Sequence, residues 1–220
     1  MSLTRRNFGA ALAATVLAAA CAFQPFGLIG SAMAQEIDPA ELAKPAPLGD
    51  IVLGSANAPV TMIEYASLSC GHCAQFHKAV YPTIKSDYID TGKVRFIFRE
   101  YPLDLQAAAA SMLARCVGRG DALKYHGALG TLFGSQEEWV RKETREQLRR
   151  IANQAGLDDD GFHTCLANQA TVDALKLGME HAHVRLKVDS TPTFFVNGVR
   201  LKGAWSLDEF RKLIDSKLKS

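Results

Sequence analysis

Two cysteines separated by two residues are the part of this sequence best suited to chemistry. They are Cys70 and Cys73, with Gly71 and His72 between them. Cys70 ends a segment typical of a strand and begins one typical of a helix, where unpaired N–H groups and the helix dipole favour an anion. A thiolate at this point is stabilised and reactive at neutral pH. The spacing therefore predicts a pair that cycles between dithiol and disulfide.

The two cysteines are expected to have different roles. Cys70 should be the accessible nucleophile, whereas Cys73, one turn inside the helix, should be the resolving partner that closes the internal disulfide. His72 would add a positive partner or a hydrogen-bond donor for the thiolate. Because a stabilised thiolate favours the reduced form, the disulfide form becomes a stronger oxidant of other proteins.

A Cys-x-x-Cys pair has other uses, namely half of a zinc site or a purely structural disulfide. Zinc needs a second pair of ligands at tight spacing. His77 follows Cys73 by four residues, but His181 and His183 lie far along the chain, so we expect no metal. Haem attachment requires a histidine directly after the second cysteine, and Ala74 stands there instead.

Charge divides the chain of 220 residues into two parts. The formal net charge is +2, from 25 Lys and Arg against 23 Asp and Glu. Residues 1–34 contain Arg5 and Arg6 and no acid, which leaves 25 − 2 = 23 basic residues against 23 acidic ones in the remainder. Nucleic-acid phosphates require a basic surface, so this neutral body predicts no nucleic-acid partner.

The first 34 residues have the three-part layout of a secretory signal. Arg5 and Arg6 precede an apolar run over residues 10–20, and Ala34 ends a stretch of small residues suited to a signal peptidase. The residues around the two arginines also resemble the twin-arginine export motif, and both export routes stay open. We expect cleavage after Ala34 and a periplasmic location; an uncleaved anchor or lipidation at Cys21 are the alternatives.

The remaining chain alternates between strand and helix patterns around a long helical block. Residues 35–58 are expected to form an extended leader, and residues 59–104 a strand–helix–strand unit whose helix is kinked by Pro82. Residues 105–186 predict a helical insertion, and residues 187–220 two strands and a final helix. The expected strands are 51–53, 60–66, 94–98, 193–196 and 199–201, and the expected helices 71–85, 105–117, 122–133, 143–155, 159–168 and 172–184.

Three stretches, together with this order of elements, resemble the DsbA-type thiol:disulfide oxidoreductases. The stretches are Ala58-Pro59-Val60 through Glu64 to Cys73, Val94–Leu103, and Thr191–Gly198. The resemblance covers nearly all of residues 50–220. It implies an α/β, thioredoxin-like fold, with a central β-sheet flanked by helices and an inserted all-helical subdomain.

The resemblance also implies roles for three residues outside the cysteine pair. Pro192 matches the proline that is cis in thioredoxin folds and stands opposite the cysteines, and the backbone of Thr191 would pair with a substrate strand. Glu64 matches a buried acid that helps to move the proton of the second cysteine. Strand alternation places Glu64 on the face of Val60 and Met62, which is consistent with partial burial.

The function implied is that of a periplasmic dithiol oxidase. It would transfer its Cys70–Cys73 disulfide to unfolded or newly exported cysteine-containing proteins, with no cofactor besides this disulfide. A quinone-linked, DsbB-like membrane partner would reoxidise it. Residues 35–59 are too few for a dimerisation domain, so a monomer is expected. The alternatives are a disulfide isomerase or reductase of the same fold, and a non-redox peptide-binding chaperone using a groove near Pro192.

Two further cysteines lie in the predicted insertion. Cys116 and Cys165 each fall on the apolar stripe of an expected helix, so both are expected to be buried. They could form a structural disulfide that closes a loop of about 50 residues, or remain free thiols that pack as small apolar side chains. The remaining histidines are expected at the surface: His126, His163, His181 and His183.

Overall fold

The computed structural model describes residues 37–219 of the chain. The expected export signal of residues 1–34 lies outside that range, as do its cleavage site after Ala34 and the candidate lipidation site Cys21. Within residues 37–219, no helix has the length and apolar character needed to cross a membrane.

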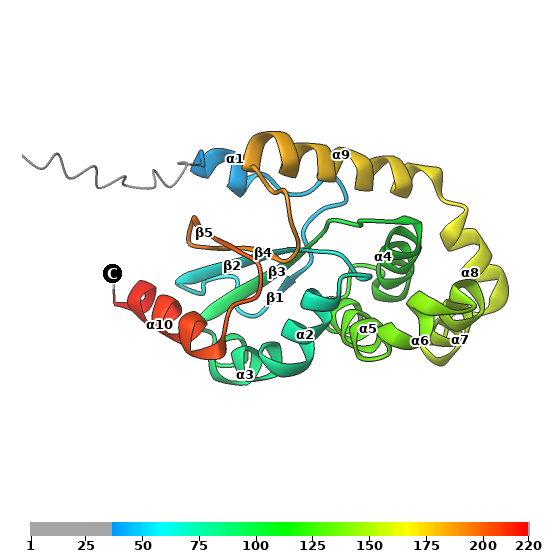
Figure 1. Cartoon of the computed structure of the whole chain (residues 1–220), viewed down its shortest axis with the longest axis horizontal. Helices are drawn as coiled ribbons and strands as arrows, with labels where there is room; N and C mark the ends of the chain where they lie inside the picture. Colours follow the sequence, from blue (N-terminus) through cyan, green and yellow to red (C-terminus); the bar gives the residue numbers. More distant parts are fainter. Residues whose placement is uncertain (1–36, 220) are drawn as a thin grey trace, which may run out of the picture. The chain divides into compact units, whose positions relative to one another are not determined.

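One mixed sheet forms the centre of the described region (Figure 1). Its strands run in the order β1-β3-β2-β4-β5, with β2 and β3 parallel and the other neighbours antiparallel. Parallel neighbours require a crossover connection, and the segment that carries the cysteine pair supplies it. The strand bounds are β1 Val52–Leu53, β2 Val60–Ala66, β3 Val94–Glu100, β4 Thr193–Val196 and β5 Val199–Lys202.

The crossover from β2 to β3 is a broken helix, as the proline within it predicts. Helix α2 covers Gly71–Ala79, α3 covers Tyr81–Ile84, and a π-helical turn follows over Lys85–Ile89. Pro82 lies in the first turn of α3, where its missing N–H leaves no hydrogen bond unmade. The break therefore lies between α2 and α3, and α2 remains a regular helix beneath the cysteine pair.

Strand alternation in β2 gives the sheet two different buried faces. Met62 and Glu64 are fully buried on the face covered by α2, α3 and the C-terminal helix α10, Leu207–Leu218. Ile63 and Tyr65 pack on the opposite face, in a separate apolar cluster with residues of helix α1, Pro39–Ala43, and helix α9, Gln169–Leu186. Figure 1 shows α1 and α9 along one side of the sheet and α2, α3 and α10 along the other.

Helix α1, Pro39–Ala43, corrects the expectation of a wholly extended leader over residues 35–58. The side chain of Asp38 caps it by accepting a hydrogen bond from the N–H of Ala40 at 2.8 Å. A capping aspartate followed directly by proline favours a helix start, so the local signal was present in the sequence. The short helix packs against α9 and helps to cover the second face of the sheet.

Helices fill the chain between β3 and β4, and asparagine or aspartate side chains cap four of them. Helix α6 was not expected, and the helix expected at 143–155 begins one residue later as α7. Figure 1 shows α4 to α8 grouped beyond one end of the sheet, whereas α9 runs back along it. The bounds are α4 Leu105–Gly118, α5 Ala122–Gly134, α6 Gln136–Arg141, α7 Thr144–Gln154, α8 Asp159–Leu166 and α9 Gln169–Leu186.

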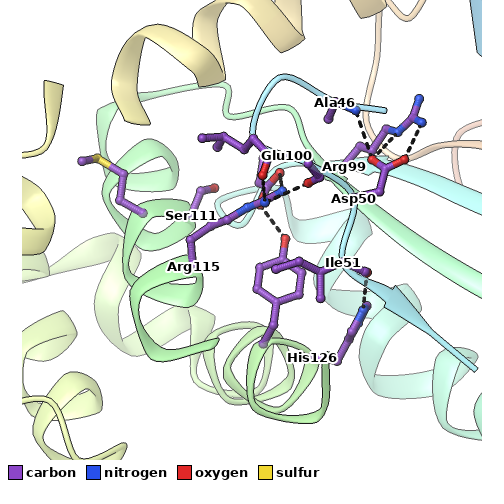
Figure 2. A network of polar contacts seen from close by, with 12 residues as sticks. Ala46, Asp50, Ile51, Arg99, Glu100, Ser111, Arg115 and His126 are labelled. Carbon is purple, nitrogen blue, oxygen red and sulfur yellow. Dashed lines mark hydrogen bonds and ion pairs between the residues drawn. The ribbon is translucent and has the colours of Figure 1, made fainter. Parts of the chain in front are cut away.

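Buried ion pairs join the leader, β3 and the insertion (Figure 2). Arg115 of α4 makes two hydrogen bonds to the carboxylate of Glu100, at 2.6 and 2.8 Å, and Tyr125 of α5 donates a third at 2.5 Å. Arg99, the neighbour of Glu100 in β3, makes two to Asp50 of the leader, at 3.0 and 2.8 Å. The end of β3 is thereby fixed from both sides.

His126 corrects the expectation that the remaining histidines lie at the surface. It is only 8% exposed, and its Nε2 donates to the carbonyl oxygen of Ile51 at 3.1 Å (Figure 2). His126 lies on the same helical stripe as Leu129 and Phe133, both buried, so the packing of α5 carries it inward. His163 and His183 are exposed, and His181 is half-buried.

Candidate active site

Cys70 lies at the N-cap of α2, just outside the helix, and Cys73 lies one turn inside it. Both thiols are free in this structure. The Cys70 side chain is half-buried, and its Sγ lies 3.4 Å from the carbonyl oxygen of Thr191, to which it donates when it is protonated. Cys73 is fully buried. The pair therefore has one sulfur that an incoming thiolate can reach and one that it cannot.

Hydrogen bonding lowers the pKa of Cys70 to about 5. The largest contribution is a hydrogen bond from the Cys73 thiol, and the backbone N–H groups of His72 and Cys73 add to it. These are the unpaired donors of the first helical turn. They outweigh the opposing effect of burial, so Cys70 is a thiolate at neutral pH.

The pKa of Cys73 moves the other way, well above the ordinary value for a thiol. Burial is the main cause, followed by its hydrogen bond to Cys70 and the negative charge of Glu64. Cys73 therefore holds its proton when Cys70 does not. If the bond between the two sulfurs breaks, the thiolate left on Cys73 is strongly basic and takes up a proton.

Glu64 lies in the middle of β2 with none of its surface exposed. Its Oε2 is 2.9 Å from Nε2 of His77, in the last turn of α2. Its Oε1 is buried and has no hydrogen-bond partner within the described part of the chain. The two carboxylate oxygens are thus in different environments, one paired with an imidazole and one open.

His77 was considered from sequence only as a zinc ligand, and the structure gives it a different partner. Because His77 follows Cys73 by four residues, the sequence predicts that both lie on the same side of a helix. That spacing is the sequence feature that points to His77 as a neighbour of the cysteine pair. Over residues 37–219, no group of three or more His, Cys, Asp or Glu side chains is arranged to hold a metal ion.

Thr191 and Pro192 lie beside the cysteine pair, immediately before β4. The peptide bond between them is cis, and Pro192 is buried while Thr191 is half-buried. The carbonyl of Thr191 faces Cys70, as the hydrogen bond to its Sγ shows. The two segments are 121 residues apart in sequence and are brought together because β4 pairs with β2.

The side chain of His72 is exposed next to Cys70. It makes no hydrogen bond or ion pair with any residue that the structure describes. The contribution of His72 to the Cys70 thiolate is therefore made by its backbone N–H. The sequence had suggested the imidazole for this purpose.

Gln136 is the site residue that sequence reasoning missed altogether. It begins α6, is 6% exposed, and its Nε2 donates to the carbonyl oxygens of Leu68 at 2.7 Å and Cys70 at 3.0 Å. The backbone N–H of Ala74 also donates to the Cys70 carbonyl, at 3.1 Å. A side chain of the insertion thus fixes the loop that ends in the nucleophile.

Cys116 and Cys165 are joined by a disulfide between α4 and α8, with an S–S distance of 2.04 Å and a sequence separation of 49. Of the two alternatives left by the sequence, the structure therefore has the bonded one. Cys165 is buried as expected, whereas Cys116 is half-buried. The bridge lies within the helical insertion, and its sulfurs are distinct from the free pair on α2.

The chain is similar in sequence to known thiol:disulfide exchange proteins. A family model described as Thioredoxin matches residues 47–216. A Rickettsia felis protein that bears the name of a protein-disulfide oxidoreductase is 31% identical over 184 residues, which cover 83% of this chain and 65% of that protein. Disulfide bond formation protein D of Bacillus subtilis is 26% identical and covers 80% of each chain. The chain spans 60% to 66% of the length of the Rickettsia relatives.

Solved structures agree with the sequence relatives. The crystal structure of alpha-DsbA1 from Wolbachia pipientis is 35% identical, with a TM-score of 0.76 over 81% of this chain and 95% of that chain. BdbD from Bacillus subtilis, in its oxidised form, is 23% identical with a TM-score of 0.71. The similarity to BdbD therefore concerns the fold alone, whereas the similarity to alpha-DsbA1 extends to the sequence.

Proposed function

The chain belongs to the DsbA-type thiol:disulfide oxidoreductase family, and on that premise we propose that it oxidises pairs of thiols in other proteins. The oxidant is a disulfide between Cys70 and Cys73, and no further cofactor takes part. The observation that carries this proposal is the opposite displacement of the two thiol pKa values, one lowered and one raised.

The opposite shifts of the Cys70 and Cys73 pKa values favour transfer of the disulfide from this protein to a substrate protein. A stable Cys70 thiolate lowers the free energy of the reduced protein, so the disulfide form is the less stable partner and a stronger oxidant. Cys70 is also a good leaving group from a mixed disulfide, because a thiolate of low pKa departs quickly.

The reaction proceeds in two exchanges. A substrate thiolate attacks Sγ of Cys70, the bond to Cys73 breaks, and its electron pair stays on Cys73, which takes up a proton. The second substrate thiolate then attacks the substrate sulfur of the mixed disulfide and expels the Cys70 thiolate. The substrate loses two electrons and gains a disulfide, while the protein becomes a dithiol.

Substrate binding would use the backbone next to the cis-proline. The carbonyl oxygen of Thr191 lies 3.4 Å from Sγ of Cys70, so an extended substrate segment paired with this backbone would lie directly beside the nucleophile. Main-chain pairing of this kind tolerates many sequences, as an oxidase of many clients requires.

The two-step exchange also bears on the substrate proteins and on how the Cys70–Cys73 disulfide is restored. Unfolded or newly exported cysteine-containing proteins are the proposed clients, and the periplasm the proposed location. Each turnover leaves a dithiol, so an electron acceptor must restore the disulfide, and a quinone-linked, DsbB-like membrane partner is proposed. The protein would act as a monomer.

The test uses the oxidised protein and a reduced, unfolded protein substrate with two cysteines. We expect stoichiometric formation of the substrate disulfide, complete loss of this activity in Cys70→Ser, and retention of it in the matched control Cys116→Ser/Cys165→Ser. Oxidation by the Cys70→Ser variant would contradict the proposal. Recovery of folded substrate with Cys70→Ser/Cys73→Ser would instead indicate peptide binding without redox chemistry.

A further inference from the structure

His77 lies between a fully enclosed carboxylate and the protein surface. The side chain of Glu64 has no exposed surface, whereas 3% of the His77 side chain is exposed, and Nε2 of its imidazole is 2.9 Å from Oε2 of Glu64. Buried side-chain atoms without partners include Oε1 of Glu64 but not Nδ1 of His77. The imidazole thus offers Nε2 to the carboxylate, which leaves Nδ1 as the nitrogen that water can reach through the small exposed part of the ring.

Aromatic rings hold the imidazole in this position. Phe133 of α5 stacks on it, with ring centroids 4.1 Å apart and an interplanar angle of 16°. Phe76 and Phe98 present edges to it, at 5.3 and 6.0 Å. Packing of this kind fixes the ring orientation and surrounds the hydrogen bond to Glu64 with apolar groups.

The ionisable groups near His77 come from each neighbouring element. Glu64 faces it from β2, Tyr81 from α3 with a centroid distance of 4.9 Å, and His126 acts on it electrostatically from α5. The hydroxyl of Tyr81 is buried without a hydrogen-bond partner in the described structure, and burial raises its pKa. Tyr81 therefore stays neutral, and Glu64 is the ionisable group to which His77 is hydrogen-bonded.

The proposed reaction creates a need for such an exchange. When a substrate thiolate attacks Cys70, the buried Cys73 sulfur takes up a proton, and when the disulfide is restored it gives that proton up. Glu64 interacts electrostatically with Cys73 and has an unpaired oxygen, but no surface of its own. A carboxylate that serves as proton donor in every cycle must itself be recharged from solvent.

We propose that His77 recharges it, carrying the proton between solvent and Glu64; this inference rests on the proposed function. During substrate oxidation the carboxylate of Glu64 takes the Nε2 proton of His77 and passes a proton on to Cys73, while His77 takes up a proton from water at Nδ1. Reoxidation of the cysteine pair runs these transfers in reverse, so the imidazole regains its starting tautomer. His77 is a positioning and relay residue, since it touches Glu64 and no sulfur.

The test is a His77→Gln variant. The glutamine amide reproduces the Nε2 hydrogen bond to Glu64 but cannot pass a proton. Single-turnover rates are measured by stopped flow between about pH 5 and pH 8, for oxidation of a dithiol peptide and for the reverse reduction of its disulfide. We expect both rates to fall by about tenfold or more, with the reduction potential unchanged, because a relay affects both directions equally.

The matched control is His126→Gln, which replaces another buried histidine whose imidazole does not contact Glu64. Its two rates should equal those of the wild type. Wild-type rates in the His77→Gln variant, or a shifted potential without a loss of rate, would overturn the relay. Equal wild-type rates in H2O and D2O would overturn it even if the variant did not fold. Loss of activity in Cys70→Ser tests the proposed function separately.

Discussion

The side-chain amide of Gln136 donates a hydrogen bond to the carbonyl oxygen of Cys70, at 3.0 Å. Gln136 belongs to the helical insertion and Cys70 to the strand–helix junction, at a sequence separation of 66. The contact shows that the insertion takes part in the active site. It holds the loop before the nucleophile in the position from which the N–H groups of α2 reach the sulfur.

Replacing Gln136 by alanine should therefore affect both stability and reactivity. The carbonyls of Leu68 and Cys70 lose a buried donor, which should lower the free energy of unfolding by about 1–3 kcal/mol. The looser loop should also raise the pKa of Cys70, because its sulfur is less well aligned with the helix N-terminus. Urea unfolding and titration of thiolate absorbance measure the two effects. Gln169→Ala, on an exposed glutamine of α9, should change neither, and an unaltered pKa in the Gln136 variant would contradict this role.

Removing the Cys116–Cys165 bridge should cost stability. The bond closes a loop with a sequence separation of 49, and loss of such a constraint on the unfolded chain amounts to about 2–4 kcal/mol. The Cys116→Ser/Cys165→Ser protein should unfold at correspondingly lower urea concentration than the wild type. Wild-type protein treated with a strong thiol reductant should show a similar loss. Equal stability of variant and wild type would mean that the bridge does not constrain the unfolded chain.

His126 should make stability depend on pH. Burial lowers its pKa from 6.5 to about 4 in the folded protein, so the folded state binds fewer protons than the unfolded state between these values. Its contribution is complete above pH 6.5 and is lost as the pH falls toward 4. The loss can reach about 3 kcal/mol. In His126→Gln the fall in unfolding free energy over this range should be smaller, whereas the exposed-site control His163→Gln should follow the wild type. Parallel curves for His126→Gln and wild type would contradict the assignment.

Alkylation should separate the two active-site thiols. Because the pKa of Cys70 is about 5, the reduced protein should react with a neutral alkylating reagent at a rate that is nearly constant above about pH 6. The modified residue, identified by peptide mass, should be Cys70 alone, since Cys73 is buried and protonated. A rate that keeps rising through about pH 8.5, the value of an ordinary thiol, would show that Cys70 is not activated.

Local patterns in the sequence predicted the elements that carry the cysteines. Alternating apolar residues marked β2 at Val60–Ala66, and Pro82 marked the break after α2. The same alternation predicted partial burial of Glu64, which in the structure is fully buried. Such features depend on neighbours within a few residues, and this is why periodicity identifies them.

Other site residues depend on contacts between distant segments. Nothing near Gln136 in sequence indicates that its amide meets Cys70, because that contact arises from the position of α6, in the helical insertion, beside the loop that precedes α2. His126 could have been found, since it shares a helical stripe with Leu129 and Phe133, but a histidine on such a stripe is ambiguous until its partner, the carbonyl of Ile51, is known. Long-range packing accounts for both.

The reduction potential of the Cys70–Cys73 couple tests the central claim most directly. It is measured by equilibrating the protein with defined glutathione mixtures and trapping the thiols. A stabilised Cys70 thiolate predicts an oxidising couple, with a potential above about −180 mV. A potential near about −270 mV, as in a reducing thioredoxin, would contradict the account, because the disulfide would then be too stable to transfer to substrate thiols.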